Sequence, residues 1–365
     1  MPRIEPAVLR TFGRELFEAV GVPTAVAKPV VASLVRADLV GHSSHGIHRI
    51  PWYGGWVEDG NIDPTADPTV VTETPTTAVL DGRFTFGQIV GRRAVDVLAE
   101  KAQEHGIAAV GIRNGSHLGR IGEWAERTTD EELLFGAFAH SQGQGALVAP
   151  PGSADRRLST HPLSFGVPTF DALSFPIVLD MATSQVANGK IKERAADGDT
   201  IPVGWTVDEN GDPVTDPAAF ADGAGAMRPL GGAVSGYKGY GLGVIVELFG
   251  ALLGGGEAFG MESEKPWSNG AAFIAIDPTR FLPEDDIETR IASLAAYLHA
   301  TERSAAVADG IGAKETDETL LPGEAEHRTA EQNRTAGIPV ADGVFDGLVE
   351  FAEEHGVGDV VPKIN

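Results

Sequence analysis

Apolar residues near the start of the chain recur with the period of a helix. A spacing near 3.6 residues places them on one face of a helix over residues 5–20, which Gly21 and Pro23 end. A second helix-like run covers residues 25–40. The N-terminal part of the chain therefore predicts a small helical unit. The apolar positions of the first helix are Val8, Leu9, Phe12, Leu16 and Val20.

From residue 78 onward the pattern alternates between short apolar strands and amphipathic helices. Such alternation favours an α/β sheet with helices packed on it. A buried helix flanked by glycines and a final amphipathic helix follow, and the latter is expected to fold back on the N-terminal unit. The expected strands are 78–80, 107–112, 133–139, 176–179 and 271–276, and the expected helices are 90–105, 121–127, 242–253 and 345–355.

A proline- and threonine-rich segment, Asp63 to Thr77, interrupts the pattern and predicts a boundary between two units. We expect a helical unit made of residues 1–65, joined by about 236–260 and the tail about 325–365. Residues 66–235 and about 261–324 would form the α/β unit. A chain of 365 residues exceeds what one compact core usually absorbs, which supports this division.

The charge is strongly negative, with 52 acidic and 28 basic residues and a net charge of −24. Such a field repels nucleic acid and anionic lipid, so neither is an expected partner. The acidic residues are scattered along the chain and lysines are few. We interpret this as adaptation to high cytoplasmic salt, that is, a halophilic protein, with an ordinary acidic protein as the alternative.

The chain contains no cysteine, which removes disulfides, thiolate nucleophiles and cysteine metal sites from consideration. It shows no secretory signal pattern and no uninterrupted apolar run of about 18 residues, the length that a membrane span needs. These features predict a cytoplasmic protein with no membrane association.

The common motifs of nucleotide and zinc sites are missing. No G-x-G-x-x-G pattern follows a strand, no G-x-x-x-x-G-K-[ST] loop is present, and no H-E-x-x-H pair occurs. The absence argues against the common doubly wound dinucleotide fold. It leaves nucleotide binding open, because any helix N-terminus with free N–H groups can hold a phosphate.

The stretch SSHGIHR, residues 43–49, combines a serine, histidines and an arginine within helical reach. Arginine can hold a carboxylate bidentately, and histidine can exchange a proton near neutral pH. A surface histidine cluster is the structural alternative. A metal site formed by His42, His45 and His48 is a second alternative, although no acidic or cysteine ligand accompanies the three imidazoles.

Three further stretches have the character of a site. His117 follows the strand 107–112, where α/β proteins place ligand contacts, or else caps the next helix. Asp180 ends a strand before a polar turn and could orient an imidazole or cap a helix. Lys238 stands in a glycine-rich stretch that predicts a turn before the buried helix, either a phosphate cradle or only a tight turn.

Taken together, these stretches resemble the malate/L-lactate dehydrogenase family, which includes sulfolactate, ureidoglycolate and diketogulonate oxidoreductases. The resemblance spans nearly the whole chain, and one departure is His161, where the family pattern T-N-P-x-x-F-G has asparagine. The matching positions are Ser44-His45-Gly46, Arg49, Pro51 and Tyr53, then 114–119, 160–166, Leu179 to Ser184, Lys238 to Leu242 and Pro322 to Glu324.

The resemblance implies a family-specific α/β fold that is not of the Rossmann type: a mixed-sheet NAD(P)-binding domain, a smaller helical domain built from both chain ends, and a homodimer. It implies His45 as general acid/base, Asp180 as its orienting partner, and Ser44, Arg49, Tyr53 and His117 around the substrate, with His117 as the other candidate for proton transfer. Cofactor contacts are implied at Ser141, Asp180, Met181, Ala182, Thr183, Ser184, Tyr237, Lys238, Pro322, Gly323 and Glu324.

The expected activity is hydride transfer between NAD or NADP and a small 2-hydroxy acid or its 2-oxo acid, with no metal. Malate, lactate and sulfolactate share the carboxylate and hydroxyl that this chemistry needs. Two alternatives stay open from the residues themselves: a histidine-ligated metallohydrolase and a non-catalytic nucleotide-binding protein.

Overall fold

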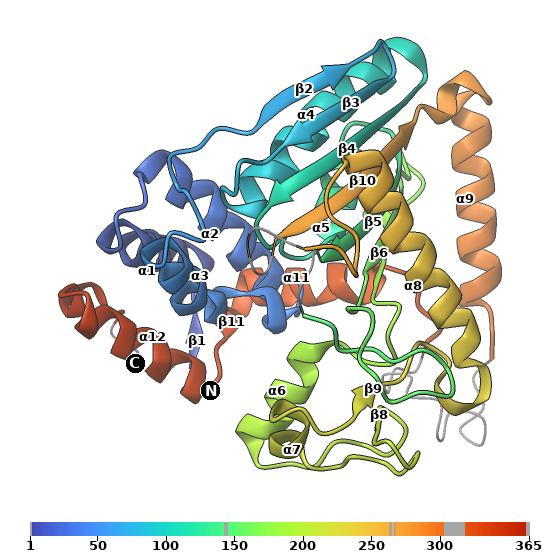
Figure 1. The fold of residues 1–365 in the computed structure, drawn as a ribbon. Helices are drawn as coiled ribbons and strands as arrows, with labels where there is room; N and C mark the ends of the chain where they lie inside the picture. Colours follow the sequence, from blue (N-terminus) through green and yellow to red (C-terminus); the bar gives the residue numbers. More distant parts are fainter. Residues whose placement is uncertain (1, 142–144, 263–264, 266–267, 303–317, 363–365) are drawn as a thin grey trace.

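The computed structural model describes residues 2–141, 145–262, 265, 268–302 and 318–362 (Figure 1). Its centre is a seven-stranded mixed sheet with the order β2-β3-β4-β10-β5-β6-β7. Only β3 and β4 pair in parallel, and the other neighbours are antiparallel. The strands are β2 (Thr69–Glu73), β3 (Thr77–Asp81), β4 (Ile107–Gly115), β5 (Leu134–Ser141), β6 (Leu163–Val167), β7 (Ile177–Met181) and β10 (Asn269–Ile276).

Helices cover both faces of the sheet (Figure 1). α4 (Gly87–His105) and α5 (Gly122–Thr129) pack on one face, and α8 (Gly232–Gly254) crosses β4, β5 and β10 on the other. Glycine permits this close crossing, since a Cβ on Gly111 would lie 1.8 Å from the Leu253 carbonyl oxygen. Side chains such as Leu80, Ile112 and Phe273 are fully buried in the core between α4 and the sheet.

The N-terminal helices form a second core together with the end of the chain. α1 (Pro6–Ala19), α2 (Thr24–Leu39) and α3 (Ile50–Glu58) share one hydrophobic cluster with residues of α11 (Glu324–Ala336) and α12 (Asp342–Glu354). β1 (Arg3–Ile4) and β11 (Ile338–Pro339) pair and tie the two chain ends together. The tail therefore packs against the N-terminal helices.

A smaller lobe lies beside these two units and holds its own apolar cluster (Figure 1). The sequence patterns did not predict it as a separate body. It contains α6 (Asn188–Asp197), α7 (Pro217–Ala221) and the strand pair β8 (Thr206–Val207) and β9 (Ala226–Met227). A long helix, α9 (Glu284–His299), stands at the right of the view in Figure 1, and its Ala295 shares a small apolar cluster with Phe175 and Leu321.

The segment Asp63 to Thr77, expected as a boundary between units, contains β2, whose β-branched residues form the edge of the sheet. One local expectation was wrong. The predicted glycine-rich turn around Lys238 is helical, since α8 begins at Gly232 and includes it, with a kink at Ser235. α8 also packs on the sheet, whereas we expected residues 236–260 to join the helical unit. No helix among the described residues is long and apolar enough to cross a membrane.

Candidate active site

The stretch SSHGIHR forms two short 3₁₀ turns, η1 (Ser43–His45) and η2 (Ile47–Arg49), between α2 and α3. Asp38, near the end of α2, anchors them by accepting a hydrogen bond from the Ile47 N–H at 2.8 Å. Gly46 makes this approach possible, because a Cβ there would lie 1.8 Å from Asp38 Oδ1. Burial raises the pKa of Asp38 to about 7, although the Ile47 N–H lowers it. The turns therefore present their side chains from a fixed backbone.

Two histidine rings face each other at the junction of the helical unit and the sheet. His45 comes from η1 and His117 from the loop after β4, and their ring centres are 5.6 Å apart and nearly parallel. Ser44 Oγ lies 3.0 Å from His45 Nδ1. Tyr53 Oη, from α3, lies 2.6 Å from His117 Nδ1. Each ring thus has Nδ1 held by a hydroxyl, and neither Nε2 has a protein partner among the described residues.

The hydroxyl partners distinguish the two histidines. Gln88 donates to Tyr53 Oη at 3.3 Å, and burial raises the pKa of Tyr53, so the phenol keeps its proton. The remaining role of that hydroxyl is to donate to His117 Nδ1, which leaves the proton of neutral His117 on Nε2. Ser44 can accept from His45 Nδ1, which leaves the lone pair of His45 on Nε2. His117 is therefore arranged as a hydrogen-bond donor, and His45 can be a proton acceptor.

Positive charge surrounds these rings. Arg49 donates from Nε to the Ser44 carbonyl at 2.8 Å and lies over Trp52, with Cζ 4.6 Å from the ring centre. Burial, reinforced by neighbouring positive groups, lowers the pKa of His117 to about 3 and that of His45 well below its usual range. The same causes lower the pKa of His48 to about 4. The three imidazoles are therefore neutral at pH 7, and the neighbouring cations favour binding of an anion at this site.

Asp180, expected to orient His45, has other partners. Its Oδ2 accepts a hydrogen bond from the Gly122 N–H at 2.8 Å at the start of α5. Burial raises its pKa, while the neighbouring Arg120 guanidinium opposes this. The orienting contact at His45 comes from Ser44 instead. Asp180 lines a pocket with His42, Arg120, Pro322 and Gly323, beside the histidine pair's segment.

Five of the eleven residues expected at a cofactor, Asp180 to Ser184, lie at the end of β7 and in the turn that follows it. Met181 ends β7 and pairs with Leu163 of β6, and Ala182 leads into the turn. The Thr183 N–H donates to the Thr160 carbonyl, and the Thr183 carbonyl accepts from the Leu230 N–H. Ser184 donates from Oγ to the Val186 carbonyl at 2.6 Å. This turn thus connects Asp180, which lines the first pocket, with the segment before α8, where a second pocket lies.

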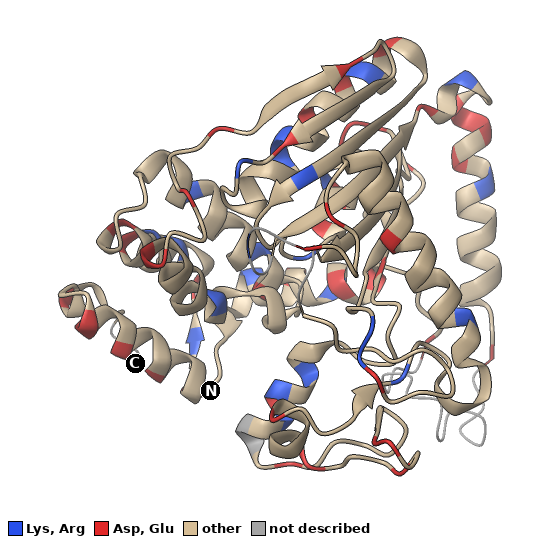
Figure 2. Ribbon diagram, viewed as in Figure 1, with Lys and Arg blue, Asp and Glu red and all other residues tan. Residues whose placement is uncertain are grey.

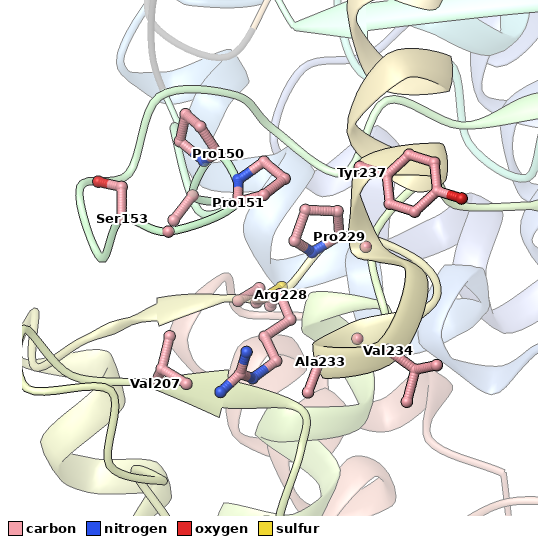
Figure 3. Close-up of a pocket in the computed structure, with 14 residues that line it drawn as sticks. Pro150, Pro151, Ser153, Val207, Arg228, Pro229, Ala233, Val234 and Tyr237 are labelled. Atoms are coloured by element: carbon pink, nitrogen blue, oxygen red, sulfur yellow. The ribbon is translucent and has the colours of Figure 1, made fainter.

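The second pocket is lined by Arg228, Tyr237, Pro150 and Pro151 (Figure 3). The Arg228 guanidinium has no hydrogen-bonded or ion-paired partner within the described part of the chain, and its Nε is buried. An unpaired guanidinium beside the N-terminus of α8 and an exposed tyrosine ring fit the phosphates and rings of a dinucleotide. The residues present are thus compatible with a nicotinamide cofactor on both sides of the turn.

Three of the residues expected to contact a cofactor do not line either of these pockets. Glu324 is buried and turned inward, with Oε2 2.9 Å from His299 Nε2 and Oε1 2.6 Å from Arg328 Nη2. Lys238 is exposed on α8, 6.0 Å from the Tyr237 ring centre. Ser141 ends β5 and donates to Ser159 at 3.4 Å.

His161, the departure from the family pattern, points into the interior. Its Nε2 lies 2.8 Å from Glu247 Oε2, and His140 Nδ1 lies 3.3 Å from the same oxygen. All three side chains are buried between α8 and the strand ends. His161 therefore contributes to a buried charge cluster that joins α8 to the sheet.

The metal alternative finds no support in the geometry. His42 contacts Glu326 at 3.3 Å, and His45 contacts Ser44, so the side chains of the histidine stretch diverge. Across the described ranges, no group of three or more histidine, aspartate or glutamate side chains is arranged to hold a metal ion.

The sequence patterns did not predict several residues of the site. Gln88 sits within α4 and carries no motif, and Trp52 reads as an ordinary helix aromatic. Asn269 accepts from the Leu118 N–H at 3.0 Å and donates to the His140 carbonyl at 3.1 Å, which secures the His117 loop to β5. Lys192 approaches Trp52 from α6. No sequence signal available in one chain marks these residues.

Comparison with known proteins places this geometry in a family. The model of the malate/L-lactate dehydrogenase family matches residues 4–349. L-sulfolactate dehydrogenase from Methanocaldococcus jannaschii is 32% identical over 349 residues, covering 94% of each chain. Malate dehydrogenase from Pyrococcus horikoshii is 32% identical over 361 residues, covering 97% of this chain and 96% of that one.

The solved structure of malate dehydrogenase from Entamoeba histolytica superposes with a TM-score of 0.88 at 26% identity, covering 97% of this chain and 98% of that one. The family match, the sequence identities and the superposition agree. This chain belongs to the malate/L-lactate dehydrogenase family and is an oxidoreductase of the malate, lactate and sulfolactate dehydrogenase type.

Proposed function

We propose that this chain interconverts a 2-hydroxy acid and its 2-oxo acid with NAD or NADP, using His45 for the proton and Arg49 for the carboxylate. The observation that carries the proposal is the pair of neutral imidazoles beside the Arg49 guanidinium, which has no acidic partner among the described residues. The chemistry that a bound nicotinamide would supply is hydride exchange with C2 of the substrate. The remaining steps belong to the side chains of this chain.

His45 Nε2 takes the hydroxyl proton during oxidation and returns it during reduction. A positioned acid–base group typically contributes about 10² to 10⁴-fold to the rate. Ser44 fixes the ring by its contact at Nδ1. His117 donates from Nε2 to the same substrate oxygen, because Tyr53 and Gln88 hold its tautomer. Arg49 binds the C1 carboxylate with the planar fork of its guanidinium.

Asp180 and the turn 181–184 are proposed to contact the cofactor, together with Tyr237, Arg228 and the Pro322-Gly323 backbone. Support comes from their arrangement on the two sides of one turn. Glu324 supports this region indirectly, since its carboxylate accepts from the Leu321 N–H at 3.0 Å.

The test is a panel of 2-hydroxy and 2-oxo acids assayed by nicotinamide absorbance with NAD and NADP separately. Turnover of at least one acid with one cofactor is expected. Cofactor binding without turnover of any acid would contradict the proposal and favour a non-catalytic nucleotide-binding protein.

We further propose a homodimer that buries the outer side of α8. Val234 is 93% exposed and Leu252 76% exposed, and Ile245 and Leu248 continue the apolar row between them. An exposed apolar row of this kind marks an interaction surface. Light scattering of the purified protein tests the assembly, and Leu252→Glu should shift it to the monomer mass.

A requirement for high salt is a separate proposal, based on the net charge of −24. Figure 2 shows acidic residues spread over most elements, including α9 and α12. Salt at 1 M shortens the screening length to about 3 Å and relieves the self-repulsion. The melting temperature should rise with added salt, and an unchanged value in dilute buffer would contradict this proposal.

A further inference from the structure

A second cation approaches the active site from the small lobe. Lys192, on α6, places Nζ 5.5 Å from the centre of the Trp52 ring, and Arg49 places Cζ 4.6 Å from the same centre. The two cations are therefore at most about 10 Å apart. They come from different parts of the fold, Arg49 from η2 and Lys192 from the small lobe, and they converge beside the histidine pair.

The backbone of α6 is packed directly against the catalytic turn. Gly189, at the start of α6, has no room for a side chain, since a Cβ there would lie 2.7 Å from Ser44 Cβ. Ser43 donates from Oγ to Glu193 Oε1 at 3.1 Å, a second tie between α6 and η1. Lys192 lies three residues after Gly189, which places it on the same side of the helix as the contact with Ser44. Its position next to the site follows from this packing.

Lys192 and Arg49 have no acidic partner among the described residues. Arg194, on the same helix, forms an ion pair with Asp199 at 3.0 Å, and the Glu193 carboxylate accepts a hydrogen bond from Ser43. Burial and the neighbouring Arg49 lower the pKa of Lys192, as expected of cations held together without a counter-charge. Two cations without acidic partners beside one site favour a ligand that carries two negative charges.

We propose that Lys192 binds the second anionic group of a dianionic substrate, so that the preferred substrates are 2-hydroxy and 2-oxo acids carrying a further carboxylate or sulfonate. The inference rests on the proposed function, in which Arg49 holds the C1 carboxylate. The separation of the two cations is one that a single four-carbon dianion can bridge. A monocarboxylate leaves Lys192 without a partner.

The experiment compares kcat/KM for L-malate and L-lactate in the parent and in Lys192→Gln, Lys192→Arg and Arg194→Gln. The parent should prefer malate. Lys192→Gln should lower kcat/KM for malate at least tenfold, mainly through KM, and change the value for lactate less than twofold. Lys192→Arg should keep the preference for malate, because it keeps the charge. Arg194→Gln removes a positive charge from the same helix and should leave the ratio unchanged.

Equal losses on both acids in Lys192→Gln, or an unchanged ratio, would overturn the inference while leaving the proposed function intact. A parent that prefers lactate would do the same. A parent that turns over no acid with either cofactor would overturn the proposed function, and this inference with it. Thermal unfolding of each variant identifies any loss that comes from misfolding.

Discussion

Two groups of histidines lie in this molecule, and their electrostatic surroundings are opposite. In the interior, His140 and His161 share one carboxylate oxygen of Glu247, at 3.3 Å and 2.8 Å. In the active site, His45, His48 and His117 have Arg49 as a charged neighbour and no carboxylate partner among the described residues, and His48 also has Lys192. Both groups are largely shielded from water.

The consequence appears in the protonation of each group. Although burial opposes it, contact with His140 and His161 lowers the pKa of Glu247 to about 2. The interior group therefore carries its own negative charge and needs no ligand. The active-site imidazoles are neutral at pH 7 and lie beside cations, so an anionic ligand would balance the charge of this group. The comparison teaches that a buried imidazole acquires its role from the charge placed beside it.

The largest effect is expected from His45→Ala, which removes the proposed proton acceptor. The variant should lose about a hundredfold or more in kcat while nicotinamide binding stays intact. His48→Ala, in the same stretch, should lower kcat by less than tenfold. Steady-state kinetics with cofactor titration measures both. A near-parental kcat in His45→Ala, with turnover abolished by His117→Ala, would assign proton transfer to His117.

Glu247→Gln tests the interior group. Loss of the shared carboxylate should reduce the free energy of unfolding by about 1–3 kcal/mol, because buried polar partners are left unsatisfied. The substrate KM should not change. Urea unfolding measures the difference, with Glu73→Gln as control, since the Glu73–Lys101 pair lies at the surface and should contribute under about 1 kcal/mol. Equal losses in both variants would mean that the interior cluster adds no special stability.

The two histidine groups should lose their contributions to stability over different pH ranges as the pH falls. The folded pKa values of His117 and His48, about 3 and about 4, lie below the ordinary value of 6.5. The folded state therefore binds fewer protons than the unfolded state below pH 6.5, and stability falls as pH falls, by roughly 1.4 kcal/mol per unit per histidine. The contribution of Glu247 is full above its ordinary pKa of 4.5 and is lost between that pH and about 2.

Urea unfolding at pH 7, 5.5 and 4.5 checks this order. His117→Asn should flatten the pH dependence between 6.5 and 4.5, and Glu247→Gln should leave that interval unchanged. A flattening by Glu247→Gln in the upper interval would reverse the assignment.

The smallest effect is expected from Arg49→Lys, which keeps the charge of the active-site group and changes its shape. An ammonium lacks the planar fork that matches a carboxylate, so the substrate KM should rise by about tenfold. Cofactor affinity should stay at the parental value. Initial-rate kinetics with fluorescence titration of the cofactor separates the two. A KM within error of the parent would show that Arg49 does not hold the carboxylate.

Local patterns in the sequence determined much of the framework. The helical period before Gly21 predicted α1, and the apolar run after residue 106 predicted β4. The motif S-H-G with R-x-P and a tyrosine, together with the later histidine, predicted residues that the fold brings together: Ser44, His45, Arg49, Tyr53 and His117. These succeeded because each depends on neighbours in sequence or on a motif with a fixed spacing.

Tertiary structure decided what depends on distant partners. Glycines before residue 242 suggested a turn, yet they lie in α8, where Gly239 and Gly243 let the helix approach Leu230 and Thr183. The Asp180 carboxylate accepts a hydrogen bond from the Gly122 N–H, and the contact at His45 Nδ1 is made by Ser44. Gln88, His161 and Lys192 acquired their partners only when α4, α8 and α6 packed. Residue type and spacing determine which side chains can do chemistry, but the charges beside them, and hence their protonation, are set by packing between segments far apart in the chain.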